Sequence, residues 1–458
     1  MARTLEEILS GTPEEVIKEL QTKSVELPAW DDLQKQYDPN EHEVMDTGKY
    51  PDVASDDGGL ENVTRITLDL QRLAVKRTTE LCFGIPVKRI YTPQTDGEKE
   101  VAKAIEAILK RNRIESVNIE RGNMLFASCE VATIWFATEE PNTLYGFESK
   151  LKLRCRNYSP MQGDSIYPMF DETGDMVALS FGYKRKEGDA DVEYLDVYTA
   201  DKHIRYRNDG SWAEELSEQS AIGKIPAVYC CRQTPVWEDT TNIVNEIEWA
   251  LSRNGNYLRK NSRPVLVLFA DEDLPFNQEK DEKQEFRTVG QYPKGSDLRY
   301  VTWEQAVENL KFYIGELRQS FFTQLQLPDW SYENMKTTPM SGEARKQMFI
   351  DAQLKVKDES GRLLEMLDRE INVIKAFLKI MMPQRVKDID ALQVETAITP
   401  FAINDDKELI ANLMTATGGK AIISQREGIE SLGWSADADE TMRQILEESN
   451  LDSFEVKI

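Results

Sequence analysis

The chain has 458 residues, of which 40% are hydrophobic and 9% aromatic, and it carries a formal net charge of −25. This composition can fill the cores of two to four domains and argues against a wholly disordered chain, while the excess of acids disfavours tight nucleic-acid binding, which depends on Lys and Arg contacts to phosphates. No apolar run approaches the ~18 residues that a membrane-spanning helix needs, so we expect a protein made in a cytoplasm with no membrane partner.

The first 61 residues form an acidic segment. Residues 1–62 hold 16 acids and 5 bases. An amphipathic beginning is followed by a stretch rich in turn-forming residues, which predicts an arm that is at most partly ordered. After it, residues 62–87 are expected to form a helix that ends at Gly84 and Pro86, and residues 97–112 a second helix. A third, helical or mixed, stretch leads to the middle of the chain.

The middle of the chain has the pattern of antiparallel strands. Residues 149–157 alternate apolar and basic side chains, as in a half-exposed strand. The segment 171–175, DETGD, predicts a hairpin turn between two further strands. We therefore expect a meander over about 147–214, with the basic strand faces in solvent.

Two long helices with a short insert between them come next. The first is expected over 239–260, with Ile243, Ile247, Leu251 and Leu258 on one face. The second is expected over 302–327, with Thr302 as its N-cap. Its apolar face is predicted to hold Val307, Leu310, Ile314, Leu317, Phe321 and Leu325. The insert 262–301 contains the strand-like run PVLVLFA.

A third long helix follows the loop at 328–340. Ser341 is the expected N-cap, Pro339 and Gly342 shape the turn into the helix, and the helical pattern continues to Met381 before Pro383. Ser360 and Gly361 form a pair at which long helices bend, so we expect a kink there. The remaining residues, 383–458, predict one strand and then short helices.

No catalytic motif stands out. The GGK at 418–420 lacks the earlier Gly and the following Ser or Thr of a phosphate-binding loop. The acidic groups at 271–273 and 437–440 are more typical of solvated surface than of a metal site. With two histidines and five scattered cysteines, a zinc site is improbable, and buried free thiols are expected. We expect no enzyme activity and no cofactor.

The order of these parts resembles the portal, or head-to-tail connector, proteins of tailed double-stranded DNA bacteriophages. The resemblance is carried over about 60–450 by several short segments taken in order. These are NVTRITLDLQRLAVKRTTELCFGIPV, GKIPAVYC, QLPDW with PMSGEARK, and GGKAIISQREGIESLGWSADADETMRQI. The acidic first sixty residues have no counterpart in it.

The resemblance implies an α+β, mainly helical subunit with the parts of that family. Residues 1–61 would be an arm of uncertain order, 62–238 the wing, 239–261 and 302–327 the two stem helices, and 262–301 the clip. Residues 328–340 would be the tunnel loop, 341–382 the long kinked wing helix, and 383–458 the crown. It implies a ring of twelve subunits at one vertex of the virion capsid, assembled in the host cytoplasm.

The resemblance also implies partners and sites. Double-stranded DNA would pass through the ring during packaging and ejection, without sequence-specific contacts, near Trp330, Tyr332 and Lys336. Terminase and a head-tail adaptor would dock on the clip, for which the candidates are Asp273, Glu279, Lys280, Lys283 and Arg287. Major capsid and scaffolding proteins would be further partners. The alternatives are another phage head-tail ring or capsid-vertex protein, a metal-dependent nuclease, and an acidic chaperone or scaffold.

Overall fold

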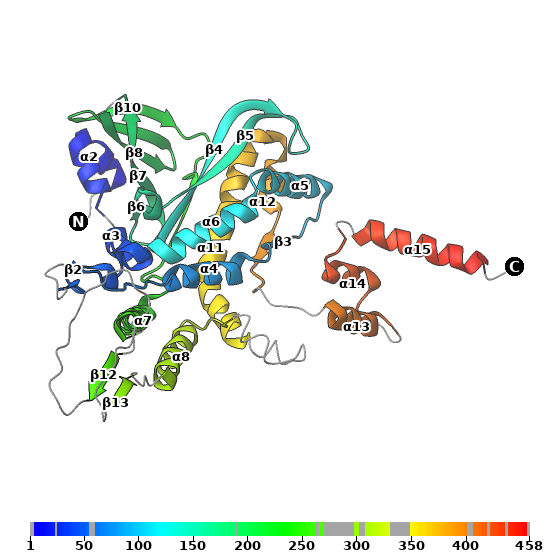
Figure 1. Ribbon diagram of the computed structural model, residues 1–458. Helices are drawn as coiled ribbons and strands as arrows, with labels where there is room; N and C mark the ends of the chain where they lie inside the picture. Colours follow the sequence, from blue (N-terminus) through cyan, green and yellow to red (C-terminus); the bar gives the residue numbers. More distant parts are fainter. Residues whose placement is uncertain are drawn as a thin grey trace.

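The structure is a computed structural model. It describes residues 4–22, 25–54, 60–188, 190–261, 265–269, 297–301, 307–329, 349–400, 406–418, 422–435 and 438–455. The fold is α+β and mainly helical, as predicted, with helices gathered around one long helix and two antiparallel sheets at one end (Figure 1).

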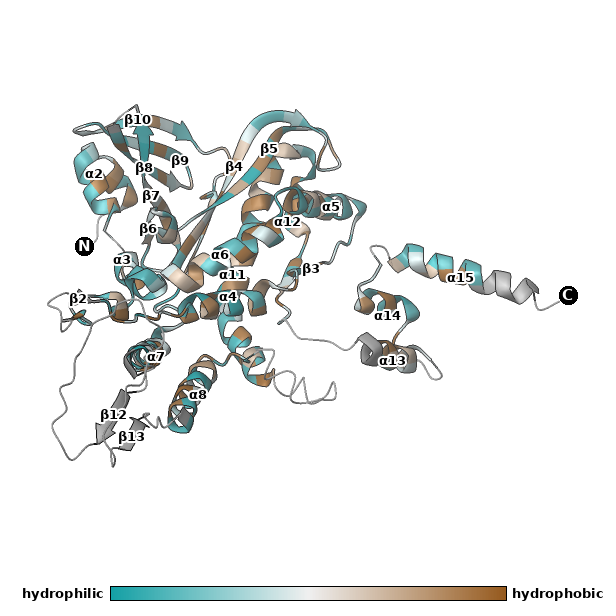
Figure 2. Ribbon diagram, viewed as in Figure 1, coloured by the Kyte–Doolittle hydropathy of each residue, from teal (hydrophilic) through white to brown (hydrophobic). Residues whose placement is uncertain are grey.

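The long helix α11, Ile350–Met381, runs through the main body of the molecule (Figure 1). Its buried face includes Leu363, Leu367, Ile371, Ile374 and Leu378, which recur every three or four residues as expected for one helical face. Helices α4 (Leu70–Phe83), α5 (Asp96–Arg111) and α12 (Val386–Ala391) pack against it. Figure 2 shows hydrophobic residues along α11 where it passes α4 and α6 (Ile114–Ser128). This helix therefore organises the largest hydrophobic core.

Two antiparallel sheets form the upper part of the view in Figure 1. One has three strands in the order β11–β4–β5, and the other has five in the order β10–β9–β8–β7–β6. Their bounds are β4 Glu130–Asn142, β5 Ser149–Tyr158, β6 Ser165–Phe170, β7 Met176–Glu187, β8 Ala190–Thr199, β9 Lys202–Asn208, β10 Trp212–Gln219 and β11 Ala227–Cys231. Apolar side chains from both sheets, such as Ile134 and Phe181, fill a core of their own. The predicted hairpin around 171–175 is confirmed as the β6–β7 turn.

The N-terminal arm is ordered in the described residues. Helices α1 (Leu5–Leu9) and α2 (Pro13–Leu20) begin with capping boxes at Thr4 and Thr12. Their apolar residues pack on one face of the five-stranded sheet, where Val16 and Ile17 meet Leu195 and Ile204. Helix α3 (Trp30–Tyr37), the short turns η1 (Pro39–Glu41) and η2 (Glu43–Met45), and the strands β1 (Val53–Ala54) and β2 (Leu60–Glu61) follow.

Helices α7 (Thr241–Asn261) and α8 (Val307–Gln324) pack against each other. Between them, β12 (Val265–Phe269) pairs with β13 (Asp297–Val301) in an antiparallel ladder. The predicted helix pair with a β-containing insert is thus confirmed, while the Thr302 cap lies outside the described residues. Of the expected apolar stripes, Ile247, Phe321 and Leu325 are buried, but Leu258 is half exposed.

The C-terminal part begins with the turn η5 (Pro383–Arg385) and α12. Strand β14 (Val394–Ala397) then pairs with β3 (Lys88–Tyr91). Helices α13 (Asp406–Thr417), α14 (Gln425–Leu432) and α15 (Ala438–Glu455) lie to one side of the main body in Figure 1. Helix α14 begins at a capping box on Ser424 and ends at Gly433, which has φ +71°.

One expectation for the first half is wrong in detail. Residues 62–69 are neither helix nor strand, and the helix predicted there begins only at Leu70. The stretch expected to be helical or mixed is mixed, with α6 followed by strand β4 and Cys129 between them in the left-handed region. The thiols of Cys82, Cys129 and Cys230 are free and buried, as predicted, and burial raises the pKa of each to about 12.

Candidate functional site

Most residues that the sequence singled out lie outside the described part of the chain. This holds for the tunnel-loop candidates Trp330, Tyr332 and Lys336, for Ser341 and Gly342 at the expected helix start, and for the clip candidates Asp273, Glu279, Lys280, Lys283 and Arg287. Gly361 is described. It is exposed in the middle of α11, which is helical on both sides of it, and a Cβ there would meet nothing within 4 Å. The kink remains a prediction.

The described residues do show how the neighbouring elements are held. Residues 62–69 lie along α7, and side chains of α7 accept backbone N–H groups of this segment. Asn256 accepts from Thr64 (2.5 Å), Ser252 from Ile66 (2.9 Å) and Glu248 from Leu68 (2.7 Å). Four residues of a helix rise about 6 Å and two residues of an extended chain span about 6.6 Å, so the two repeats match. We call these three bonds the side-chain ladder.

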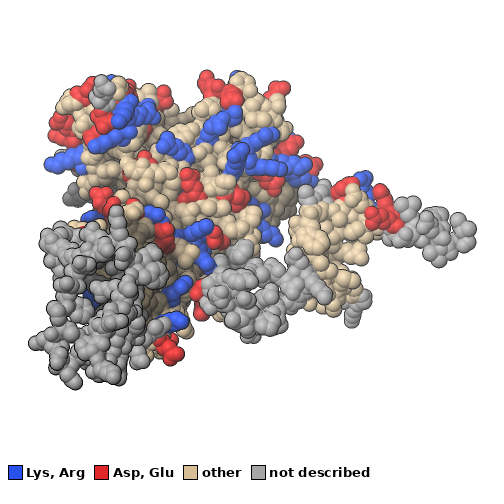
Figure 3. Space-filling model, in the orientation of Figure 1, with Lys and Arg blue, Asp and Glu red and all other residues tan. Residues whose placement is uncertain are grey.

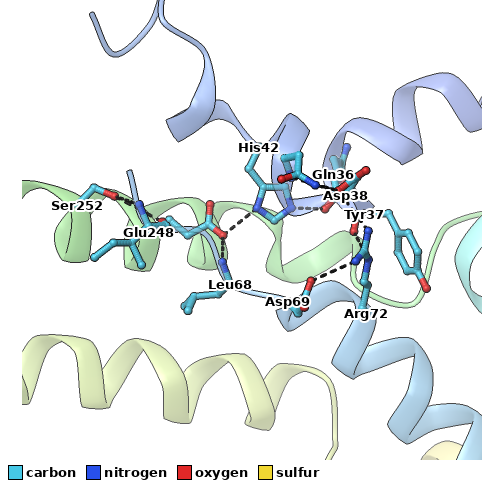
Figure 4. Close-up of polar contacts among 11 residues, drawn as sticks. Gln36, Tyr37, Asp38, His42, Leu68, Asp69, Arg72, Glu248 and Ser252 are labelled. Atoms are coloured by element: carbon cyan, nitrogen blue, oxygen red, sulfur yellow. Dashed lines mark hydrogen bonds and ion pairs between the residues drawn. The ribbon is translucent and has the colours of Figure 1, made fainter. Parts of the chain in front are cut away.

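The same Glu248 carboxylate ties the N-terminal arm to α7. Its Oε1 lies 2.8 Å from Nδ1 of His42, whose Nε2 lies 2.8 Å from the carbonyl oxygen of Gln36 (Figure 4). Both ring nitrogens face acceptors, which is the environment of the doubly protonated imidazolium. Burial lowers the pKa of His42, but the hydrogen bond to Glu248 and the Glu248 charge raise it more, so the pKa lies above its ordinary value. The side chains of both residues are almost fully buried.

A second set of contacts surrounds Arg72 of α4. Its Nε donates to the carbonyl oxygen of Tyr37 (3.1 Å), and its guanidinium pairs with Asp38 at 3.2 Å and with Asp69 at 3.6 Å (Figure 4). The guanidinium also lies 5.3 Å from the centre of the Tyr37 ring. The start of α4 and the end of α3 are thereby joined.

The segment between α8 and α11 is fixed at its α8 end. Gln326 has φ +54°, and the N–H of Leu327 donates to the carbonyl oxygen of Phe322, a bond that closes the helix C-terminus as in a Schellman motif. The carbonyl oxygen of Leu325 accepts from Nζ of Lys355 (2.5 Å), and that of Pro328 accepts from Arg77 (3.3 Å). Because Lys355 belongs to α11, this contact brings the flanks of residues 330–348 together.

Lys355 belongs to a cluster of charged groups on α11. Glu359 pairs with Arg232, just after β11, at 3.0 Å and with Arg362 at 3.3 Å. Arg362 also donates to the carbonyl oxygen of Cys231. Burial and the charge of Arg232 lower the pKa of Lys355 to about 8. The first turns of α11 are thus bonded to both α8 and the three-stranded sheet.

Further along α11, a fully buried ion pair joins it to α6. Arg121 makes two bonds to the Glu370 carboxylate, at 2.9 and 3.0 Å, and also contacts Asn118. The exposed fractions of the two side chains are 0% and 1%. Removing one partner of a buried ion pair strongly destabilises the fold, because the other charge is left buried and unpaired. The pair therefore fixes the position of α6 on α11.

The sequence reasoning missed these contacts. The spacing of Glu248, Ser252 and Asn256, four residues apart on the face opposite the apolar stripe, was an available signal for the ladder. No sequence signal pointed to the contacts of His42 and Arg121, since their partners lie more than 200 residues away. Within the described residues, no group of three or more His, Cys, Asp or Glu is placed to hold a metal ion. The contacts described above fix the relative positions of helices α4, α6, α7 and α11.

Comparison with known proteins gives the identity. The family described as phage portal protein, SPP1 Gp6-like, matches residues 18–453, nearly the whole chain. The chain belongs to this portal family. The match confirms the resemblance drawn from the short segments and extends it into the acidic arm. Portal proteins are structural proteins of the capsid vertex, and this chain shares that role. None of the described helices combines the length and apolarity needed to span a bilayer.

Other comparisons are more distant. No curated protein matches. Among solved structures, this portal chain is similar to the neck of an empty gene transfer agent particle, computed with C6 symmetry. That match has 11% identity and a TM-score of 0.41, and covers 86% of this chain and 94% of the other. A chain from the virion of a native gene transfer agent particle matches with 12% identity and a TM-score of 0.37, covering 80% and 89%.

Proposed function

We propose that this portal protein forms a ring of twelve subunits through which double-stranded DNA is packaged and ejected. The observation that carries the proposal is the family match over 18–453, together with a packed α7–α8 pair that brackets a short β-containing segment. In this proposal, α7 and α8 are the stem, residues 262–301 the clip and residues 328–340 the tunnel loop. Residues 62–238 are the wing, α11 belongs to the long wing helix of 341–382, and 383–458 form the crown.

Exposed apolar side chains on the proposed stem and crown support a ring. Phe312 and Tyr313 of α8 are 68% and 44% exposed. The crown helices and their connections expose Met414, Ile422, Trp434, Ile445 and Leu446. Apolar side chains gathered on one part of a surface are typical of protein interfaces. A neighbouring subunit in a cyclic arrangement would cover them, because a head-to-tail interface repeats around a closed ring.

The charge of the chain suits a channel that DNA must leave. Twelve chains of −25 carry −300 in total. Acidic walls repel phosphates, so the duplex would stay mobile. Lys336, Trp330 and Tyr332 are the proposed DNA-proximal residues of the tunnel loop. The contact between Lys355 and the carbonyl oxygen of Leu325 would fix the base of this loop to both the stem and the long helix.

The proposed partners follow from the same arrangement. Terminase during packaging, and later the head-tail adaptor, would dock on the clip around Asp273, Glu279, Lys280, Lys283 and Arg287. Capsid and scaffolding proteins would meet the wing. The family is structural and not enzymatic, and we propose that DNA movement is powered by a separate motor protein.

The test is the native mass of the purified chain together with top-view micrographs. The expected result is a closed ring with a central channel and a mass near twelve times 52.5 kDa. Replacing Phe312 by Ser should reduce ring formation, while Ser in place of Met45, an exposed apolar residue of the arm, serves as the control. A monomer under every condition, including with scaffolding protein present, would contradict the proposal.

A further inference from the structure

A cleft between the two sheets has a lining unlike the rest of this acidic chain. Its volume is about 600 Å³, and strands β4, β5, β7, β8 and β9 and the turn after β5 contribute to it. Four cations line it, against two carboxylates. The cations are Arg156, Lys184, Arg185 and Arg205, and the carboxylates are Asp164 and Asp196. Figure 3 shows Lys and Arg side chains, interspersed with Asp and Glu, over the two sheets in the upper half of the view. The cleft is a locally positive site on a protein of charge −25.

Two of the cations lack an acidic partner. Among the described residues, no carboxylate lies within ion-pair distance of Arg156 or Arg185. Each guanidinium instead lies over aromatic rings. Arg156 is 4.9 Å from the centre of the Tyr158 ring, and Arg185 is 5.1 Å from that of Tyr183 and 5.7 Å from that of Tyr194. Such stacking holds the guanidinium in place and leaves its N–H groups available. Arg156 belongs to the basic strand face for which the sequence suggested only solvation.

The carboxylate at the inner side of the cleft is fully satisfied. Asp196 accepts from Nε of Arg205 at 2.8 Å, from the Tyr183 hydroxyl at 2.8 Å and lies 3.0 Å from the His203 ring nitrogen. These contacts use Arg205 and fix the Tyr183 ring on which Arg185 rests. The free donors are therefore those of Arg156 and Arg185, and the Tyr183 ring under Arg185 is held by this polar network.

The chemistry of the cleft favours a carboxylate ligand carried on a peptide. Paired guanidinium groups bind carboxylates by charge-assisted hydrogen bonds. The aromatic rings Phe136, Tyr158 and Tyr198 in the lining offer contacts for the apolar parts of side chains. A nucleic acid is disfavoured, because two unpaired guanidinium groups on a chain of charge −25 supply few of the phosphate contacts from which most nucleic-acid affinity comes.

We propose that this cleft binds an acidic peptide segment of a second protein, with Arg156 and Arg185 holding its carboxylates. The site goes beyond the channel function and does not depend on ring formation, since all of its lining comes from one subunit. Most of this strongly acidic chain would repel an acidic segment, so the segment would bind at the two arginines. The cleft would thus set where such a partner docks.

The test measures binding of fluorescein-labelled hexaglutamate to the purified full-length chain by fluorescence anisotropy. The expected result is saturable binding that weakens with ionic strength. The double variant Arg156→Gln/Arg185→Gln should weaken binding at least about ten-fold, since each lost bond involves two charged groups. The matched control is Lys150→Gln/Lys186→Gln, which removes the same charge from exposed positions on the same strands outside the cleft, and it should bind nearly as wild type.

Three outcomes would overturn the proposal. The first is no saturable binding of the peptide by wild type, and the second is equal weakening by both double variants. The third is preferential binding of a labelled DNA duplex with the same dependence on Arg156 and Arg185, which would make the cleft a nucleic-acid contact. Both arginines are exposed, so unchanged thermal unfolding should show that the variants fold. Ring formation, measured separately by native mass, keeps a failure here distinct from a failure of the channel proposal.

Discussion

Replacing Glu248 by Gln should loosen the attachment of the N-terminal arm and of residues 62–69 to α7. The change keeps the shape of the side chain and an acceptor oxygen, and removes the charge that both Leu68 N–H and His42 face. A hydrogen bond to a charged group contributes about 1.5–3 kcal/mol and a neutral one about 0.5–1.5 kcal/mol. Two such bonds weaken together, so the free energy of local opening should fall by about 1–3 kcal/mol.

Amide hydrogen exchange read by mass spectrometry measures this opening directly, because the N–H groups of Thr64, Ile66 and Leu68 are themselves the donors. Exchange in a peptide covering 62–70 should become about 5- to 150-fold faster, at about 1.36 kcal/mol per factor of ten. Glu246→Gln on the same helix is the control, since Glu246 is exposed and accepts a bond from Tyr313, on the α8 side of α7. Equal exchange in wild type and Glu248→Gln would refute the reasoning.

The same variant tests the charge on His42. Because its pKa in the folded chain is raised above the ordinary value of 6.5, the stabilisation by the imidazolium is complete below about pH 6.5 and is lost as pH rises through the folded pKa. After correction for the intrinsic pH dependence of exchange, wild-type protection of 62–70 should therefore fall as pH rises above 6.5. In Glu248→Gln the largest contributions that raise the His42 pKa are removed, and only the Gln36 carbonyl and the Asp38 charge remain to oppose burial, so this fall should become smaller.

Three further predictions concern α11. Arg121→Met should destabilise the chain by about 3–5 kcal/mol in urea unfolding, because Glu370 is left buried and unpaired, and adding Glu370→Met should recover much of the loss. The pKa of Lys355 is lowered to about 8, so in the folded chain Lys355 loses its buried charge as pH rises above about 8, while in the unfolded chain it keeps the charge up to about 10.5. Between these values the unfolding free energy of wild type should therefore rise relative to that of Lys355→Met. Gly361→Ala should raise the unfolding free energy of the monomer by up to about 1 kcal/mol, since a Cβ meets nothing within 4 Å. Impaired ring assembly with intact folding would support a required bend at Gly361, and normal assembly would count against it.

Local patterns predicted much of the fold. Two examples are the apolar repeat of α11 from Leu367 to Leu378 and the turn at 171–175. Both depend on residues close together in the sequence, so a local pattern is enough to predict them. The expectation of a helix over 62–69 was wrong because these residues obtain their hydrogen bonds from α7 side chains nearly 190 residues away. The sequence left the stretch that holds strand β4 open between helical and mixed, because EVATIWF is buried on both faces and has no alternation to read.

The candidate site was less accessible to sequence reasoning. The His42–Glu248 and Arg121–Glu370 pairs each join distant parts of the chain, and a single charged residue gives no sign of its partner. Arg156 was correctly placed on an exposed strand, but its distinction from Arg154 lies in the Tyr158 ring beneath it and in the second sheet opposite. Such properties arise only when the two sheets face each other.

The side-chain ladder also makes the position of α7 discrete. A displacement of α7 by one residue would carry Glu248, Ser252 and Asn256 out of reach of all three donors at once, because the acceptors occur only once per helical turn. A displacement by a full turn in one direction would bring Val244, which has no side-chain acceptor, opposite Leu68. Intermediate positions along the helix axis are therefore unfavourable, and an axial force on α7 would reach the N-terminal arm as a stepwise load and not as continuous sliding.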